Sequence, residues 1–416
     1  MPSLHVEIKE FYAQSLQILN PWKVTAVSIV NPETTKEPGI VEVRVECCEK
    51  VLWVDPDTGE RATIHGWRER RWRHLDTCEF QTWVVAMVPR IKLSSGKVVT
   101  AKVPWAESMQ RFTNAMETRL ILVLRLCPAV SKASIVAGIT RDEADGVMAR
   151  AVARGLDRRA PDPLELIGID EKAIREGHRY ATILTDLIGE RVIDVVQERT
   201  KEAAAGMLEA LPEPMTAGIE AVAMDMWPAF IGAVEEKLPK AAIVFDRFHV
   251  KKYLNNGVDL VRRQENKQLS AAGDMVLKGT KYQWLRTHED MRLKSAVEFR
   301  QLLVHNLQTG TAWGLKEMFE HFWTYKSRAC AMRFFYAWIQ SVEDSGLKPM
   351  IAAAGTLHRH MAGIMNYITF PITNASAEGM NSIIQSLRTV ARGLPNFANF
   401  RARILFHLGG LDMNPA

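Results

Sequence analysis

The first 110 residues contain short runs in which apolar and polar positions alternate, the pattern of half-buried β-strands. These runs are VTAVSIV, EVRVEC and QTWVVAMV. A further segment, GWRERRWRH at residues 66–74, interleaves arginine with tryptophan. In this arrangement arginines can bind phosphate groups while the aromatic rings stack on bases. A solvated strand edge with its tryptophans turned toward the core gives the same pattern, so both interpretations stay open.

Residues 111–154 change to helical spacing of apolar positions. AMETRLILVLRL predicts a helix that ends at Cys127-Pro128, because proline cannot continue a helix. SKASIVAG predicts a short second helix, and a capping box from Thr140 to Glu143 predicts the start of a third, DEADGVMARAVARGL. A short helix, a turn and a longer basic helix are the parts of a helix-turn-helix DNA-binding domain. Many helix bundles contain the same trio.

Residues 165–250 alternate strand-like and helical runs. We predict strands over ELIGID, YATILTDL and RVIDVVQER, with a hairpin turn at Gly189-Glu190 between the last two. Helices KEAAAGMLEALPE and WPAFIGAVEEKLP then alternate with strands IEAVAMD and AAIVFD. The order β-β-β-α-β-α-β is that of a ribonuclease-H-like fold, in which helices cover a mixed sheet.

The patterns divide the chain into five predicted parts. These are a β-rich DNA-binding module (1–108), a helix-turn-helix domain (109–160), the first part of an α/β ribonuclease-H-like core (161–250), an all-helical insertion (251–370), and the C-terminal helices of the core (371–416). The first 160 residues hold 23 Lys and Arg against 19 Asp and Glu, so most of the net charge of +5 lies there. Excess positive charge in that region favours an anionic partner such as DNA.

The rest of the composition is that of an ordinary globular protein, with 47% hydrophobic and 24% charged residues. The five cysteines are few, odd in number and scattered, which favours reduced thiols in a cytoplasm, in this case associated with the nucleoid. No run approaches eighteen uninterrupted apolar residues, so no membrane span is expected.

Three acids stand at the ends of predicted elements. Asp170 ends the first core strand, Asp225 ends the fourth, and Glu378 begins a late helix. In the proposed sheet the first and fourth strands are neighbours, so their carboxylates would meet at one edge. Carboxylates that converge without a basic partner repel one another unless cations neutralise them, and oxygen ligands favour Mg²⁺. Taken singly, each acid is more simply a solvated turn residue.

The chain resembles the DDE transposases of bacterial insertion sequences, most closely the ISL-three family. The resemblance rests on IGIDE, on residues 110–154, on the block that runs from AVAMDMW to LVRRQE, and on NASAEGMNSIIQSLRTVARGLPNFANFRARIL. It implies a transposase that binds the terminal inverted repeats of its element, cuts the element ends and joins the 3′-hydroxyls to target DNA. The implied catalytic and metal-binding residues are Asp170, Asp225 and Glu378, with Mg²⁺ as the cofactor and Mn²⁺ able to substitute.

The resemblance also implies partners and supporting residues. The partner is double-stranded DNA, from the element ends and the target, bound by a homodimer on paired ends. Asp246 and His249 follow the fifth core strand and match an Asp and a His of related transposases. We expect both to have auxiliary roles at the site. The simpler alternative for His249 is a hydrogen-bonded core residue. The expected DNA-binding residues are Arg68, Arg70, Arg71, Arg73, Arg141, Arg150 and Arg154.

The family's N-terminal zinc module is the one place where the resemblance fails. Such modules use two cysteine pairs, whereas here Cys47 and Cys48 are adjacent and Lys92 and Ser95 occupy the other expected positions. The spacing of the remaining candidates (His65, His74 and Cys78) does not suit a tetrahedral zinc site. We therefore expect no structural zinc.

Two other functions remain as alternatives to an active transposase. One is a catalytically silent, element-derived protein that binds specific DNA; loss of any one acid would favour it, and all three are present. The other is a ribonuclease acting on hybrid duplexes, which shares the predicted core but lacks the insertion and the N-terminal modules. Fold alone does not separate these, because function depends on the site.

Overall fold

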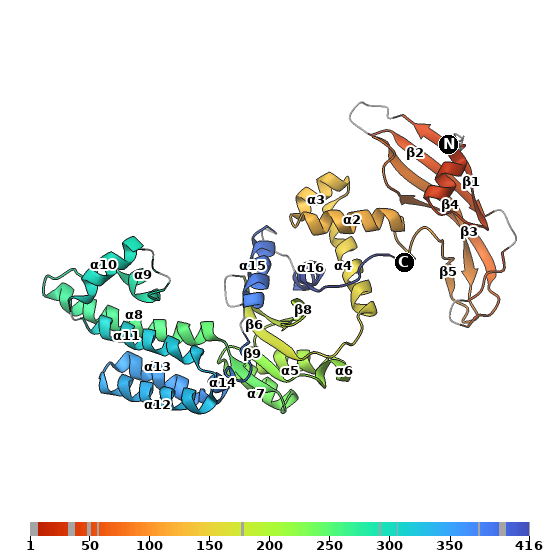
Figure 1. The fold of residues 1–416 in the computed structure, drawn as a ribbon. Helices are drawn as coiled ribbons and strands as arrows, with labels where there is room; N and C mark the ends of the chain where they lie inside the picture. The colour runs from red at the N-terminus through yellow and green to blue at the C-terminus, as the bar shows by residue number, and fades with distance from the viewer. Residues whose placement is uncertain are drawn as a thin grey trace, which may run out of the picture. The chain divides into compact units, whose positions relative to one another are not determined.

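The computed structural model describes residues 7–31, 38–47, 51–55, 58–175, 179–289, 291, 293–305, 307–372, 375–390 and 397–415. Within these ranges the side chains of residues 175, 179, 293–295, 375–378 and 390 are not described. The chain forms two compact units (Figure 1). Unit 1 comprises Met1–Arg159 with Leu411–Ala416, and unit 2 comprises Ala160–Gly410.

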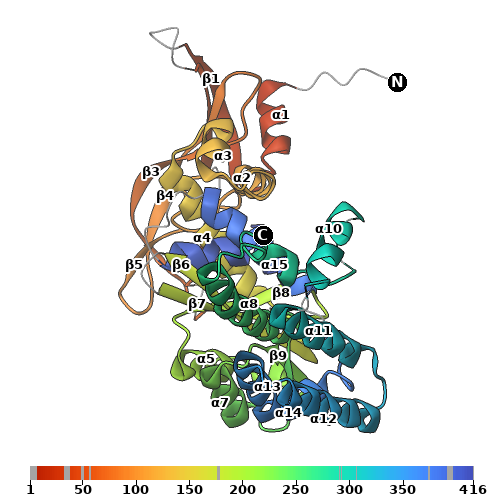
Figure 2. The same cartoon turned by 90° about the vertical axis from the view of Figure 1, so that its left-hand side faces the viewer.

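Unit 1 begins with a five-stranded mixed sheet. Its elements are α1 (Ile8–Ser15), β1 (Trp22–Val30), β2 (Ile40–Cys47), β3 (Thr63–Arg73), β4 (Gln81–Lys92) and β5 (Val98–Thr100). The strand order is β1-β2-β4-β3, with β5 on β4, and only β2 and β4 pair in parallel. Helix α1 lies beside β1 in both views (Figures 1 and 2). The three strands predicted here are confirmed, whereas α1 and β5 were not predicted.

A tryptophan cluster forms the core of this sheet. The ring of Trp105 meets those of Trp22 and Trp72 edge to face, with centroids 5.1 and 5.5 Å apart. Trp72 is fully buried, whereas Trp67 on the same strand is 49% exposed. The Arg/Trp segment is therefore strand β3, with Trp72 turned inward as the structural interpretation required.

Three helices complete unit 1: α2 (Asn114–Leu126), α3 (Val130–Ala137) and α4 (Arg141–Arg158). Gly138 ends α3 with φ +63°, the left-handed conformation that glycine adopts without strain. The predicted capping box opens α4, because Thr140 and Glu143 each hydrogen-bond the other's backbone N–H. The three helices predicted from the sequence are thus confirmed.

The end of the chain packs on α4. Arg158 donates to the carbonyl of Asn414 at 2.6 Å, and Arg154 donates to the carbonyl of Met413. A Cβ at Gly155 would lie 2.6 Å from that of Leu411, so glycine permits this close approach. Residues 411–416 therefore belong to unit 1, which differs from the predicted segment 371–416.

Unit 2 is built on a second mixed sheet, with the strands β6 (Leu166–Arg175), β7 (Arg179–Asp186), β8 (Arg191–Gln197), β9 (Ala221–Met224) and β10 (Ala242–Phe245). Their order is β10-β9-β6-β7-β8; β6, β9 and β10 are parallel, and the hairpin strands are antiparallel. Helices α5 (Lys201–Glu209), α6 (Glu213–Thr216) and α7 (Pro228–Lys237) connect the parallel strands. The predicted adjacency of the first, fourth and fifth strands is confirmed.

Strand β9 is buried on both faces. Val222 and Met224 belong to the large core shared with α5 and α7, whereas Ala221 and Ala223 pack with Tyr367 and other residues in a second cluster. Because side chains alternate between the faces of a strand, this pattern means that other segments of the protein cover both faces of the sheet at β9.

The rest of unit 2 is helical. Its helices are α8 (Arg247–Ala271), α9 (Lys281–Leu285), α10 (Leu293–Leu303), α11 (Gln308–Glu320), the 3-10 turn η1 (His321–Thr324), α12 (Arg328–Asp344), α13 (Lys348–Arg359), α14 (Met361–Asn366), α15 (Ala375–Val390) and α16 (Phe397–Leu408). Helices α8 to α13 form an arm that extends from the sheet (Figure 1). Buried Glu265 on α8 accepts hydrogen bonds from the backbone N–H groups of Gln308 and Thr309, fixing α11 against α8.

Candidate active site

Two of the predicted acids follow neighbouring strands at the same level. The parallel pairing of β6 with β9 ends at Ile169 and Met224, and Asp170 and Asp225 come next on the two strands. Strand β6 does not end at Asp170, as the sequence suggested, but continues along β7. Neighbouring strands lie about 4.8 Å apart. The register therefore brings the two carboxylates together.

Asp246 and His249 lie beside these two acids, and together the four side chains form what we call the row. Asp246 follows β10, whose last residue pairs with Met224, and its carboxylate caps α8 by accepting from Phe248 N at 3.0 Å. In the first turn of α8, His249 places Nδ1 3.5 Å from Asp246 Oδ2 and Nε2 3.9 Å from Asp225 Oδ2. The imidazole thus lies between two carboxylates.

The electrostatics of the row favour a charged imidazole. Burial opposes the charged form, but the close contact with Asp246 and the negative charges of Asp225, Asp246 and Asp170 outweigh it and raise the pKa of His249. The side chain is 15% exposed, so water screens these charges little. A protonated His249 offsets part of the negative charge in the row.

Helix α15, which carries Glu378, lies against the same edge. Asn381 Nδ2 donates to Asp170 Oδ2 at 2.6 Å, and Arg388 Nη1 donates to the carbonyl of Ala173 at 2.9 Å. The side chain of Glu378 is outside the described part of the structure. Its backbone position is one turn before Asn381, and residues three apart share one helix face. Sequence reasoning missed Asn381, although this spacing from Glu378 was visible.

Glu171 has a different environment from its neighbour Asp170. Arg199 Nη1 lies 3.0 and 2.9 Å from its two carboxylate oxygens. The guanidinium is 3.9 Å from the ring centroid of Tyr180 and 4.8 Å from that of Trp227. Glu171 is therefore paired with an arginine that two aromatic rings hold in place. This cluster was also missed, because its members are distant in sequence.

The chemistry of the remaining acids suits a hard cation. Among the described residues, no Lys or Arg forms an ion pair with Asp170 or Asp225; their partners there are Asn381, His249 and adjacent backbone N–H groups. Two carboxylates on adjacent strands, with room on each for further ligands, are an oxygen donor set of the kind that Mg²⁺ prefers. Asp170 and Asp225 are therefore ligands of the right type for this ion, whereas the side chain of the third proposed ligand, Glu378, is not described.

The predicted DNA-binding arginines fall into two groups. Arg68, Arg71 and Arg141 are exposed. Arg73 is buried and paired with Asp76, and half-buried Arg70 donates to the carbonyl of Gln110. On α4, Arg150 pairs with Glu117 at 3.0 Å, and Arg154 pairs with Glu107 and Glu117 at 2.7 Å. The guanidinium groups of Arg73, Arg150 and Arg154 are thus committed to contacts inside unit 1.

An α/β unit with acids at the edge of its central sheet, attached to a basic unit, is an arrangement that suits the class of metal-dependent enzymes that cut and join DNA. A family model described as a transposase, for the DDE transposases of the ISL-three group, matches residues 167–404. The chain belongs to this transposase family. A second model, described as the zinc-finger of transposase IS204/IS1001/IS1096/IS1165, matches residues 51–92.

Named relatives agree with the family. The transposase for insertion sequence element IS1001 of Bordetella parapertussis is 27% identical over 91% of this chain and 94% of its own length. The transposases for element IS1557 of two Mycobacterium tuberculosis strains, CDC 1551 / Oshkosh and H37Rv, are each 22% identical over 83% of this chain and 81% of their own. In the part of the chain that the structure describes, no helix has the length and apolar character needed to cross a bilayer.

The zinc-finger match corrects one expectation. We expected no structural zinc because Lys92 and Ser95 replace expected ligands; this was wrong, since residues 51–92 match the family's zinc-finger. Within the described ranges, no three His, Cys, Asp or Glu side chains are grouped so as to hold a metal ion, and Cys48 lies outside those ranges. Of the other candidates, Cys78 is exposed, and burial beside Arg73 lowers the pKa of His74 to about 4.

Asn381 gives a first prediction for the site. Asn381→Ala should lower DNA cleavage about 10–100-fold, the usual cost of losing a group that orients a metal ligand. It should also raise the Mg²⁺ concentration for half-maximal cleavage, because Asp170 loses its hydrogen bond. Ser382→Ala, at an exposed position on the same helix, is the control. Reduced cleavage with an unchanged Mg²⁺ requirement would assign Asn381 to packing instead.

Proposed function

We propose that this protein binds the terminal inverted repeats of an insertion sequence, cleaves DNA at the element ends and joins the 3′-hydroxyls to target DNA. Unit 1, with its β-rich module and helix-turn-helix-like helices, would bind the ends. Catalysis would occur in a ribonuclease-H-like core formed by residues 161–250 and the helices after 371, with 251–370 as an insertion. The observation that carries the proposal is the alignment of Asp170 and Asp225 beside α15.

The proposed catalytic residues are Asp170, Asp225 and Glu378, which would hold Mg²⁺ or Mn²⁺. Metal bound by these residues would supply activation of the attacking oxygen and stabilisation of the leaving oxygen during displacement at phosphorus. The hydrogen bond from Asn381 orients Asp170. Asp246 holds His249 beside Asp225, where its positive charge attracts the DNA phosphate to the acidic edge.

We propose that the exposed arginines of unit 1, Arg68, Arg71 and Arg141, contact DNA phosphates. Such contacts fix the register of a protein on DNA but carry no sequence information. Paired element ends present two cleavage sites, and a homodimer would supply one active site for each.

The test is cleavage of a labelled duplex that carries the element ends. We expect strand cleavage at the ends and joining to a target duplex in Mg²⁺, no reaction in EDTA, and recovery with Mn²⁺. End-specific binding without cleavage in either metal would identify a silent DNA-binding protein. Preferential cleavage of the RNA strand in a hybrid duplex would identify a ribonuclease instead.

A further inference from the structure

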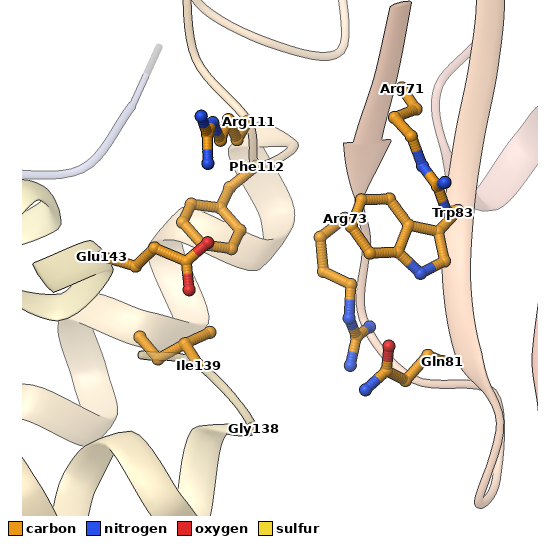
Figure 3. A pocket seen from close by; sticks show the side chains of 9 residues that line it. All are labelled: Arg71, Arg73, Gln81, Trp83, Arg111, Phe112, Gly138, Ile139 and Glu143. Atoms are coloured by element: carbon orange, nitrogen blue, oxygen red, sulfur yellow. The ribbon is translucent and has the colours of Figure 1, made fainter. Parts of the chain in front are cut away.

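Unit 1 contains a cavity of about 370 Å³ between the sheet and the helices (Figure 3). One wall comes from β3 and β4, and the other from the segments that lead into α2 and α4. The lining residues are Arg71, Arg73, Gln81 and Trp83 on the first wall and Arg111, Phe112, Gly138, Ile139 and Glu143 on the second. The volume lies within the range of about 300–1,000 Å³ typical of small-ligand sites.

The charges in this arginine–aromatic pocket favour an anion. Its one carboxylate, Glu143, already accepts hydrogen bonds from the backbone N–H and the hydroxyl of Thr140, both at 2.9 Å. Arg73 is neutralised by Asp76. Arg71 and Arg111 are exposed, and no carboxylate among the described residues forms an ion pair with either. Two uncompensated guanidinium groups therefore remain to bind a phosphate.

The aromatic residues favour a flat group beside that anion. The guanidinium of Arg71 lies over the indole of Trp83, 4.0 Å from the ring centroid. Phe112 faces it from the opposite wall, and Gln81 lies beside the stack (Figure 3). Nucleobases stack on aromatic rings and on arginine planes alike. The amide of Gln81 offers both a donor and an acceptor to a base edge.

We propose that the arginine–aromatic pocket binds one unpaired nucleotide of a DNA strand. Arg71 and Arg111 hold its phosphate, the base occupies the space between the Arg71–Trp83 stack and Phe112, and Gln81 contacts the base edge. A base inside an intact duplex cannot reach such a pocket, so the nucleotide must leave the helical stack. The inference rests on the proposed DNA binding by unit 1 and adds a local distortion of the bound DNA.

The experiment measures the affinity of the full-length protein for duplexes by fluorescence anisotropy. A single-nucleotide bulge is moved along an element-end duplex and along a random duplex. Because a bulge removes the cost of unpairing, we expect at least one position to bind about tenfold tighter than the paired duplex, the scale of one base stacked on an aromatic ring. An abasic bulge, which keeps the phosphate and lacks the base, should lose this gain.

Substitutions test whether the gain in affinity for the bulged duplex depends on the arginine–aromatic pocket. Arg71→Ala and Arg111→Ala should each reduce the gain to twofold or less. Arg119→Ala, which removes the same charge at an exposed position on α2 outside the pocket, should retain it. No gain at any position, an equal gain with the abasic bulge, or equal losses in all three variants would overturn the proposal.

The experiment distinguishes a failure of the pocket proposal from a failure of the proposed function. Cleavage of paired element ends without any gain from a bulge would overturn the pocket alone. A gain in the random duplex that Arg71→Ala removes, without preference for element ends, would support the pocket and overturn end recognition.

Discussion

Asp225→Asn is expected to abolish DNA cleavage and joining, whereas Asp246→Asn should leave a measurable fraction of both. Asp225 follows the strand next to β6, so its carboxylate can share a metal pair with Asp170; Asp246 is one strand further, about 10 Å from Asp170. We expect a loss of roughly 10³-fold or more for Asp225→Asn, beyond the 10–100-fold typical of residues that only support metal ligands. Asparagine also caps helices well, so Asp246→Asn should preserve the start of α8.

Single-turnover cleavage of an element-end duplex in Mg²⁺ measures both variants. Their DNA affinity, determined in parallel, should match that of the unaltered protein, because both residues lie in unit 2. If Asp246→Asn proved the more damaging change, the second metal ligand would be Asp246 and the role of Asp225 would need revision.

Arg154→Met is expected to destabilise unit 1 by about 1.5–3 kcal/mol, the scale of a lost hydrogen bond to a charged group, because the buried Glu117 keeps its pairing with Arg150. The carboxylate of Glu117 is 3% exposed and bonds to Arg154, whose side chain is 9% exposed. Arg154 also binds Glu107 and the carbonyl of Met413, so its loss releases both the loop before α2 and the end of the chain. Methionine retains the apolar volume, so the effect reports the lost charge.

Calorimetric unfolding of the full-length protein measures this change in the transition of unit 1. Arg141→Met on the same helix, at a side chain 51% exposed, should shift stability by no more than about 0.5 kcal/mol. An Arg154→Met protein as stable as Arg141→Met would show that the ion pairs contribute nothing net.

The strand order of unit 2 was predictable because local signals and chain connectivity agree. Apolar runs that end in acids gave β6, β9 and β10. The long connections between them, through β7, β8, α5 and α6 and then through α7, suit parallel pairing. Asp170 and Asp225 then meet as a consequence of register. The extension of β6 to Arg175 was not predictable, since it depends on pairing with β7 across residues of mixed polarity.

The roles of the arginines could not be predicted from sequence. Arg150 and Arg154 occupy a basic stretch typical of a recognition helix, yet their partner Glu117 lies more than thirty positions earlier. Nothing local to α4 indicates that pairing. The expectation of no zinc also failed because it rested on a few positions. It considered only the expected ligand positions, whereas the family match reflects the pattern of the whole segment 51–92.

Helix α8 links the acidic edge to the distant arm. Asp246 caps its start, His249 lies in its first turn, and the helix continues for 25 residues, about 37 Å, to Ala271. Glu265, which holds α11, lies about 27 Å along it. One continuous helix therefore joins His249 to the arm. A displacement of the arm relative to the sheet would move His249 relative to Asp225 as well.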